Sequence, residues 1–303
     1  MIDLARSSVQ TWECDQMGHM NVQFYLERAS EANGVLAAAI GLGPRYLRQH
    51  NAVLTPIDQH IRFLKELRPG APFVLKGGVA VIEKRLLHTY VEMQHSLTGE
   101  PSATFFSALA FADGPTRAPK TLPNWSLDRA QSFRVDVPEH GRPRGLALVA
   151  PRPSPMLRDA DQLKLAHTFQ GQVLTHQCDR DGAMTPRNYM ARVSDAIPNL
   201  LGQVTGGDRS QSGRIGGAAL EYRFVYRRPA LDGDVIAIRS GLKSIGPKTY
   251  IWCHWLFDLD SGEAVATAEA VAVSMDLVER KAIPIPDALR AHLETMLVPD
   301  LSV

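Results

Sequence analysis

The segment Asp15-Gln16-Met17-Gly18-His19-Met20-Asn21 combines side chains that can do chemistry with a glycine that permits a tight turn. Asp15 offers a carboxylate that can attack a carbonyl carbon directly or act as a general base on water. His19 and Asn21 offer polar groups that could orient a carbonyl, a water molecule or Asp15. Gly18 allows the turn and the close approach of a substrate. Together these groups suit the attack of an oxygen nucleophile on a carbonyl carbon.

The apolar segment that follows this turn predicts a helix from about Val22 to Ile40. One face of that helix would carry Tyr25, Leu26, Ala29, Ala32, Asn33 and Leu36. Gly41 and Gly43-Pro44 end the pattern. A helix that begins at Val22 would place Asp15 near its positive end. Its first backbone N–H groups would be unpaired, so they could bind the negative charge that develops on a carbonyl oxygen under attack.

Each of these polar residues also has a purely structural interpretation. A carboxylate or an amide before a helix often serves only as its N-terminal cap, which applies to Asp15 and to Asn21. Histidines in turns are often ordinary surface residues, which applies to His19. Cys14 is expected to be a small buried side chain rather than a nucleophile. The functional interpretation of Asp15 is favoured because the motif recurs along the chain.

The recurrence predicts a diverged tandem duplication. The segment from Cys14 to Met20 returns 164 residues later as Cys178-Asp179-Arg180-Asp181-Gly182-Ala183-Met184, with Cys, Asp, Gly and Met in register. We further match Tyr25 with Tyr189, Arg62-Phe63 with Arg223-Phe224, and Thr98-Gly99-Glu100 with Ser261-Gly262-Glu263. A nearly constant offset along the chain is the mark of a repeat.

Each copy is expected to contain one long helix and an antiparallel sheet. In the first copy a short strand near Ser8 to Glu13 precedes the turn. Four strands should follow the helix: Ala52 to Leu67, Pro72 to Glu83, Leu87 to Ser96 and Pro101 to Phe111. A helix followed by consecutive strands is an α+β pattern, not the alternating order of a doubly wound sheet.

The domain boundaries follow from the prolines. Eight of the 20 prolines lie between residues 113 and 160, which excludes a central strand or a long helix there. A short helix around Asn124 to Gln131 and its counterpart from Pro286 to Leu297 are expected to end the two copies. We predict an N-terminal domain at residues 1–132, a proline-rich linker at 133–166 and a C-terminal domain at 167–303. The glycine-rich stretch from Gly206 to Gly217 should connect a helix to a strand.

The motif Asp15-x-x-Gly18-His19-x-Asn21, with Tyr25 on the next helix and a four-strand meander, resembles the hotdog-fold thioesterases. The closest type is the 4-hydroxybenzoyl-CoA thioesterase-like acyl-CoA hydrolases. The resemblance covers about residues 5–130 and 168–297. It implies two tandem hotdog folds, each a long helix wrapped by an antiparallel sheet, which form an internal pseudo-dimer. The tandem arrangement also resembles the acyl-ACP thioesterases.

The resemblance implies an acyl-CoA thioesterase that releases a free acid and CoA, with Asp15 as nucleophile or general base. It makes the N–H near Val22 the oxyanion donor and Tyr25 a candidate substrate contact. The opposite wall of the site would come from the second copy, where Lys248 and Thr249 could meet the CoA portion of the substrate. An acyl-ACP thioesterase and a catalytically inactive protein that binds acyl-CoA remain open as alternatives.

The second copy departs from the motif at three positions, where His19, Asn21 and Val22 are replaced by Ala183, Thr185 and Pro186. Proline has no N–H to donate to an oxyanion. We therefore expect one working site, in the N-terminal domain, and a degenerate site at Asp179.

Composition limits the remaining classes of function. At 303 residues the chain is long enough for two domains of about 150 residues each. A net charge of +1 provides no global field to attract nucleic acid or an anionic membrane. No apolar run approaches the roughly 20 residues that span a bilayer, and the first residues do not form a signal-peptide pattern.

Cysteine and histidine usage points the same way. Three cysteines are too few for a disulfide framework and indicate a cytoplasmic protein. The ten histidines form no zinc-binding pattern, so neither a metal nor a cofactor is predicted beyond the CoA of the substrate. The expected partners are an acyl-CoA and, as an alternative, an acyl carrier protein, without nucleic acid or membrane. The pseudo-dimer could itself form a homodimer.

Overall fold

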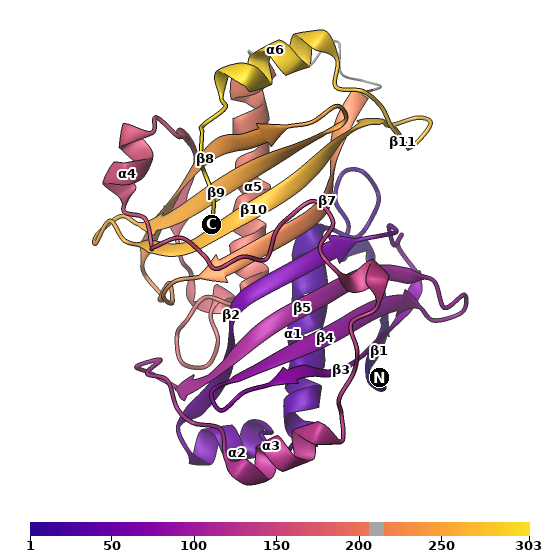
Figure 1. Cartoon of the computed structure of the whole chain (residues 1–303), viewed down its shortest axis with the longest axis vertical. Coiled ribbons are helices and arrows are strands. Elements are labelled where there is room, and N and C mark those ends of the chain that lie inside the picture. Colours follow the sequence, from indigo (N-terminus) through magenta and orange to yellow (C-terminus); the bar gives the residue numbers. More distant parts are fainter. Residues whose placement is uncertain (206–214) are drawn as a thin grey trace. The chain divides into compact units, whose positions relative to one another are not determined.

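Antiparallel β-strands and one long helix form most of the secondary structure in each half of the chain (Figure 1). The computed structural model describes residues 1–205 and 215–303, without the side chains of Val204 and Thr205. Most of the glycine-rich stretch from Gly206 to Gly217 lies outside the described residues. The chain divides into two units, Met1–Pro143 and Arg144–Val303, which we call unit 1 and unit 2.

The sheet of unit 1 has the strand order β1-β3-β4-β5-β2. Its strands are β1 (Ile2–Ser8), β2 (Ala52–Phe63), β3 (Pro72–Ile82), β4 (Leu86–His95) and β5 (Pro101–Asp113). Helix α1 (Val22–Ala39) packs against β1, β3 and β4. It does so through one buried stripe: Phe24, Tyr25, Leu26, Ala29, Ala32, Asn33, Leu36 and Ala37. Burial of this stripe holds the helix on the sheet.

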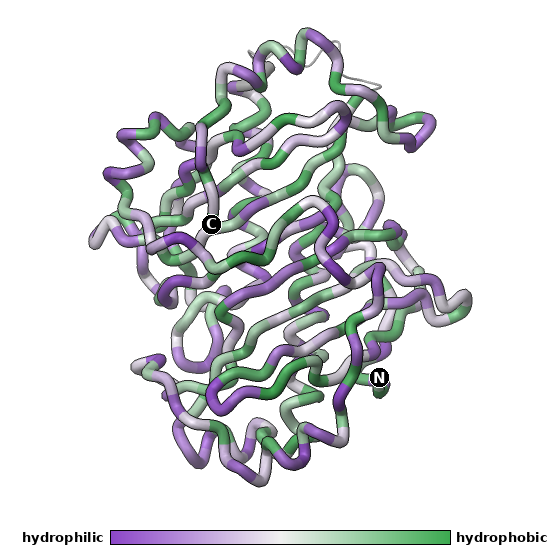
Figure 2. The backbone as a smooth tube through the Cα atoms, viewed as in Figure 1, coloured by the Kyte–Doolittle hydropathy of each residue, from purple (hydrophilic) through white to green (hydrophobic). Residues whose placement is uncertain are grey.

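The central strands of unit 1 are buried on both faces. The stretch from Thr89 to Met93 in β4 is buried without interruption, so its alternating side chains all lie away from water. The outer face is covered by the chain that follows helix α3 (Asn124–Gln131), because Arg134 bridges to Val79 and Gly141 lies against the Tyr90 ring. Figure 2 shows hydrophobic stretches along the strands of both units, interrupted by hydrophilic residues at the turns.

Unit 2 repeats this arrangement with the strand order β7-β10-β9-β8-β6. Its elements are β6 (Ala166–Gln172), helix α5 (Pro186–Thr205), β7 (Ile215–Tyr226), β8 (Val235–Ile245), β9 (Thr249–Asp258), β10 (Ala264–Asp276), β11 (Lys281–Ala282) and helix α6 (Asp287–Thr295). The short β11 pairs with β10. Strands β7 to β10 begin and end 163 residues after β2 to β5, so the predicted duplication extends to the bounds of individual strands.

One local prediction is wrong, and one helix was not predicted. The first strand is β1 at Ile2–Ser8, and Thr11–Glu13 instead forms a 3₁₀ turn, because the Glu13 carboxylate accepts the Gln10 N–H at 2.8 Å and closes it. The predicted end of the first helix at Gly41 and Gly43-Pro44 agrees with the end of α1 at Ala39. Pro44 in addition begins helix α2 (Pro44–Gln49), which the sequence pattern does not predict. Proline suits the first position of a helix, where no N–H partner is required.

The strand pairing also corrects one match between the copies. Arg62 pairs with Thr104 in unit 1, whereas Val225 pairs with Thr267 in unit 2. Since Thr104 and Thr267 are equivalent, Arg62 corresponds to Val225, and matching it with Arg223 is wrong by two residues. A slip of two residues keeps a side chain on the same face of a strand, so the hydrophobic pattern did not expose it.

The proline-rich stretch is divided between the two units. In unit 1 the Arg62 guanidinium donates to the carbonyls of His140 and Arg142 at 2.8 and 2.9 Å. In unit 2 the Arg223 guanidinium donates to the carbonyls of Ala147 and Val149 at 3.2 and 2.8 Å. Helix α4 (Leu157–Gln162) also falls inside this stretch.

Candidate functional site

The turn that carries Asp15 is closed by its own backbone. The Asp15 N–H donates to the His19 carbonyl at 3.1 Å, and the Gly18 N–H donates to the Asp15 carbonyl at 3.0 Å. Gly18 has φ +77°, a conformation in which a side chain would be strained. One carboxylate oxygen of Asp15, Oδ1, accepts the Met17 N–H at 2.9 Å. The other oxygen remains directed toward His19.

His19 lies between two carboxylates. Its Nδ1 is 3.6 Å from Asp15 Oδ2, and its Nε2 is 3.6 Å from Glu66 Oε1. Both separations are ion-pair distances and are longer than hydrogen bonds. Such contacts in ligand-free sites commonly shorten when the substrate binds. The structure thus brings together two of the residues predicted from the motif and adds Glu66, which follows strand β2.

Glu66 is also part of the lining of a hollow of about 290 Å³ in unit 1, which does not include Asp15 or His19. The hollow is lined by Lys65, Glu66, Leu67, His95, Thr98, Glu100 and Ser102. Lys65 is tied to Glu100 across this hollow at 2.6 Å, so its charge is already paired. The Met20 N–H donates to the Leu67 carbonyl at 2.8 Å and fixes the motif against this rim. Glu66 belongs both to the lining and to the His19 contact.

The beginning of helix α1 separates two roles that the sequence left open. Asn21 is the N-cap, and its Oδ1 accepts the Gln23 N–H at 3.1 Å. Its side chain therefore stabilises the helix, which is the structural interpretation of this residue. Among the described residues, Val22 N–H has no hydrogen-bond acceptor. A backbone donor at the first position of a helix suits an anionic oxygen.

Tyr25 lies inside unit 1. Its side chain is 4% exposed, and its ring makes an edge contact with Phe63 at 5.2 Å between centroids. Burial raises the pKa of the Tyr25 phenol, although interactions with Ser102 and the Leu67 backbone oppose this. Tyr189 makes the same contact with Tyr226 in unit 2, also at 5.2 Å. This repeated packing gives Tyr25 a core role, and a contact with substrate stays a prediction.

A buried ion pair anchors the chain just before Asp15. Glu13 is 2% exposed and contacts Arg28 of helix α1, which also pairs with Glu31 at 2.8 Å. The Asn21 N–H donates to the Glu13 carbonyl at 2.8 Å. Burial would lower the pKa of the Arg28 guanidinium, but Glu31 and Glu13 raise it. The 3₁₀ turn, the motif and the helix are therefore held together as one piece.

Unit 2 keeps the shape of the turn and uses its carboxylate differently. Gly182 again has positive φ, and the Asp179 N–H donates to the Ala183 carbonyl at 2.7 Å. Asp179 Oδ1 accepts the N–H groups of Asp181 and Ala183 at 2.9 and 3.0 Å. The backbone position of Glu66 is occupied by Pro229, because Ala230 accepts the Met184 N–H as Leu67 accepts that of Met20. No imidazole or second carboxylate occupies the positions of His19 and Glu66.

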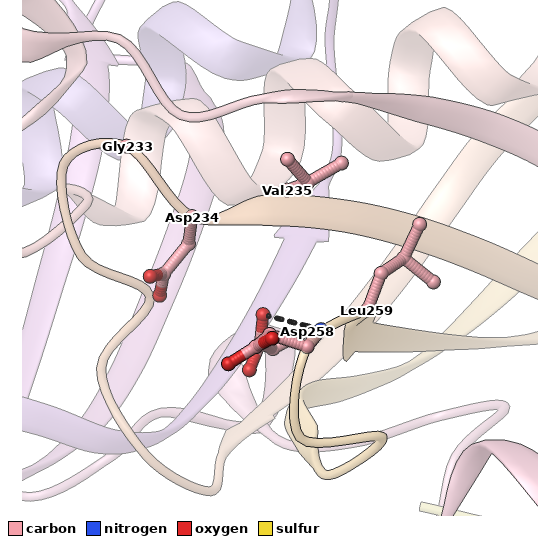
Figure 3. Close-up of a pocket in the computed structure, with 6 residues that line it drawn as sticks. Gly233, Asp234, Val235, Asp258 and Leu259 are labelled. Carbon is pink, nitrogen blue, oxygen red and sulfur yellow. Dashed lines mark hydrogen bonds between the residues drawn. The ribbon is translucent and has the colours of Figure 1, made fainter.

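The equivalent end of unit 2 carries a larger hollow of about 470 Å³ (Figure 3). Figure 3 shows the carboxylates of Asp234 and Asp258 at this hollow. Both are engaged, since Asp234 accepts the Leu231 N–H at 2.8 Å and Asp258 pairs with Arg228 at 2.6 Å. Burial would raise the pKa of Asp258, but hydrogen bonds from Ser261 and the Asp260 N–H lower it. These carboxylates stabilise turns.

The remaining predicted residues lie in unit 2. Lys248 lies in the β8–β9 turn and donates to the Ala282 carbonyl at 3.3 Å, and Thr249 begins β9. Their contribution to the wall facing Asp15 stays a prediction. Burial first, and then the charges of Asp15 and Glu13, raise the pKa of Cys14, which disfavours the reactive thiolate.

Across residues 1–205 and 215–303, no group of three or more His, Cys, Asp or Glu side chains is placed to hold a metal ion. No helix in the described part of the chain is both long and apolar enough to cross a membrane.

Glu66 is the residue that reasoning from sequence missed. The signal was present, because the offset of 163 residues places Pro229 opposite Glu66 in the second copy. The replacement of Glu66 by Pro229 could be recognised only once the strand bounds had fixed that offset.

Comparison with known proteins gives a consistent result. The family model described as the thioesterase-like superfamily matches residues 9–130 and 173–293, one segment in each unit. A comparison with curated protein sequences finds no significant match.

Three solved structures resemble nearly the whole chain. The first is a Lactobacillus plantarum protein described as a candidate oleoyl thioesterase, with a TM-score of 0.67 at 13% identity, covering 89% of this chain and 95% of its own. The second is an acyl-ACP thioesterase from Bacteroides thetaiotaomicron, with a TM-score of 0.66 at 13% identity, covering 88% and 96%. The third is the 12:0-ACP thioesterase from Umbellularia californica, with a TM-score of 0.62 at 12% identity, covering 89% and 93%. At such identities the likeness establishes the fold, and it confirms two tandem hotdog folds in an α+β chain.

Proposed function

The chain belongs to the thioesterase-like superfamily, and from that premise we propose that it hydrolyses an acyl-CoA to a free acid and CoA at the turn of unit 1. The observation that carries this proposal is the pairing of Asp15 with His19, close in sequence to an N–H without an acceptor at Val22. His19 also contacts Glu66, which lines the hollow of unit 1. Unit 2 retains the carboxylate, whereas Ala183 and Pro186 stand where unit 1 has the imidazole and the N–H donor.

In the proposed reaction Asp15 supplies the attacking oxygen or generates it. As a general base, Oδ2 takes a proton from water while the water oxygen bonds to the thioester carbon. The carbonyl oxygen becomes an oxyanion and accepts the Val22 N–H. When the carbonyl re-forms, the carbon–sulfur bond breaks, and the departing thiolate takes up the proton. As a nucleophile, Asp15 would form a mixed anhydride that water then hydrolyses.

The neighbouring residues have distinct roles in this proposal. His19 fixes the free oxygen of Asp15 and faces the thioester carbonyl. Asn21 sets the start of helix α1, and so the direction of the Val22 N–H, through its cap on Gln23. Gly18 leaves the substrate side of the turn without a side chain. Its positive φ would be strained in a residue that has a Cβ.

An acyl-ACP thioesterase is the second candidate. Two of the three structures named above are acyl-ACP thioesterases. The reaction at the carbonyl carbon would be the same for either carrier. The two candidates differ only in what binds outside the hollow.

The direct test is steady-state hydrolysis of matched acyl-CoA and acyl-ACP series by the wild-type protein and by Asp15→Asn. The proposal expects turnover of acyl-CoA and its loss in the variant. Faster turnover of acyl-ACP at equal acyl length would favour the second candidate. Tight binding of acyl-CoA without turnover of either series would refute hydrolysis and identify a binding protein.

A single turnover in ¹⁸O-labelled water tests whether Asp15 attacks the thioester directly. General-base catalysis places the label in the released acid. Direct attack followed by attack of water on the Asp15 carbonyl carbon of the anhydride leaves the first product unlabelled and transfers the label to the Asp15 carboxylate, where mass spectrometry of the peptide detects it. Label in Asp15 therefore establishes direct attack, whereas label in the acid alone is expected both for general-base catalysis and for attack of water on the acyl carbon of the anhydride.

A further inference from the structure

Glu66 lies behind the ring of His19, on the side opposite Asp15. Building on the proposed function, we infer that Glu66 is a positioning residue: it holds the His19 ring so that Nδ1 faces the Asp15 carboxylate. The geometry supports this directly, because both ring nitrogens lie 3.6 Å from a carboxylate oxygen, one from each residue. Such a ring is held at both ends.

Each of the two carboxylates favours a hydrogen on the ring nitrogen that faces it. Carboxylates accept hydrogen bonds and do not donate them when ionised. A hydrogen on Nε2 is therefore favoured by Glu66, just as a hydrogen on Nδ1 is favoured by Asp15. Removing the charge of Glu66 frees the ring to rotate or to place its hydrogen elsewhere, which weakens its hold on Asp15.

The duplication provides an internal comparison. In unit 2 the position of His19 is Ala183 and the position of Glu66 is Pro229. The two functional groups are present together in unit 1 and absent together in unit 2, while Asp15 and Asp179 both remain. Joint replacement is expected if Glu66 acts through His19. A carboxylate that served the fold of this rim would be expected in both units, as the pairs Lys65–Glu100 and Arg228–Glu263 are.

Other charged groups near this rim have partners of their own. Lys65 and Glu100 form an ion pair at 2.6 Å. The buried Tyr25 phenol is close enough to Glu66 for its pKa to be raised by that charge, after the larger effect of burial. Glu66 is 37% exposed, so substitution by glutamine keeps its shape without creating a cavity.

A double-mutant cycle tests the inference. Acyl-CoA hydrolysis is measured for the wild type, Glu66→Gln, His19→Ala and the double variant, with thermal unfolding to verify folding. Glu66→Gln is expected to lower kcat about tenfold with little change in KM, and to change kcat less than about twofold once His19 is alanine. Equal losses in both backgrounds would overturn the inference, because Glu66 would then act independently of His19.

Glu100→Gln is the matched control. It removes a second carboxylate from the same hollow, but one paired with Lys65. Its effect on kcat, whatever its size, should persist unchanged in the His19→Ala background.

A measurement independent of turnover separates this inference from the proposed function. The ¹⁵N chemical shifts of the His19 ring report which nitrogens carry hydrogen. They should change in Glu66→Gln and stay the same in Glu100→Gln. If the wild type hydrolyses no thioester, the proposed function fails while these shifts still decide whether Glu66 holds the ring. If hydrolysis occurs and the shifts in Glu66→Gln equal those of the wild type, the inference on Glu66 fails alone.

Discussion

The carbonyl of Leu67 accepts the N–H of Met20 at 2.8 Å, and this single bond holds the segment that follows β2 beside the turn that carries Asp15. Ala230 accepts the N–H of Met184 at the same distance in unit 2. The two turns are therefore held in the same frame. A residue in one unit can be compared with its counterpart in the other, which provides matched controls within one chain.

Asp15→Asn is expected to lower kcat by about 10²–10⁴, the usual contribution of a positioned acid–base group. The amide oxygen can still accept the Met17 N–H, so the turn should remain folded. Asp179→Asn is the matched control, and it should leave kcat within about twofold of wild type. Acyl-CoA hydrolysis rates decide the matter. Loss of activity in Asp179→Asn with normal activity in Asp15→Asn would assign the chemistry to unit 2.

Val22→Pro tests the backbone donor. Removal of one oxyanion donor is expected to lower kcat by about 10²–10³. The helix should tolerate the change, because Pro186 begins helix α5 at the equivalent position and proline is favoured there. Single-turnover rates with an acyl-CoA, together with circular dichroism, measure both effects.

Pro186→Val is the reverse substitution and should leave turnover unchanged. If Val22→Pro retained full activity while remaining folded, the oxyanion would have to be stabilised by another group.

Arg28→Met should destabilise unit 1 by about 3–5 kcal/mol, because Glu13 would remain buried without its cationic partner. Urea unfolding measures the change. Arg192→Met in unit 2 is the control, since Arg192 bonds the neutral Gln177 at 2.8 Å and leaves no buried charge behind. Its cost should be about 1 kcal/mol.

Glu13→Gln should largely preserve the contact with Arg28, in the neutral form that Gln177 and Arg192 make in unit 2. Equal destabilisation by Arg28→Met and Arg192→Met would mean that the charge of Glu13 contributes nothing to the tether.

The folded protein is expected to lose stability in mild acid because of the buried His254. Burial lowers the pKa of this fully buried imidazole from 6.5 to about 4, and its Nδ1 is bonded to the Ser240 hydroxyl at 2.8 Å. Between these two values the unfolded chain binds a proton that the folded chain does not. This contribution to stability is complete above pH 6.5 and is lost as the pH falls to about 4, by about 3 kcal/mol.

The measurement compares urea unfolding of the wild type and His254→Gln across that range. Other acidic and imidazole groups affect both proteins equally, so the difference isolates His254. A stability difference that stays constant from pH 7 to pH 4 would contradict the prediction.

The helix and the meander of unit 1 could be predicted because their signals are local. Apolar residues at helical spacing define α1, and its predicted start at Val22 is the observed one. Strand bounds were predicted within a few residues from turn glycines and prolines. The first strand was misplaced because the Gln10–Glu13 capping interaction, which competes with extended structure, was not recognised.

Only part of the candidate site could be predicted from the sequence, for a physical reason. Asp15 and His19 are four residues apart, so a single turn brings them together. Glu66 is brought next to His19 by the fold, because it follows strand β2. A contact between residues so far apart in the sequence cannot be recognised from the sequence alone. The role of Asn21 also required geometry, because a helix cap and a substrate contact involve the same residue types in the same position.

The two strand arginines have a consequence for the chain between the halves. Arg62 grips the carbonyls of residues 140 and 142, and Arg223 grips those of residues 147 and 149. Each unit thus binds its own end of the connecting chain through hydrogen bonds from one arginine. The connecting chain should therefore resist proteolysis, although many of its residues are exposed. Cleavage between residues 142 and 147 would leave each new end bound to its own unit.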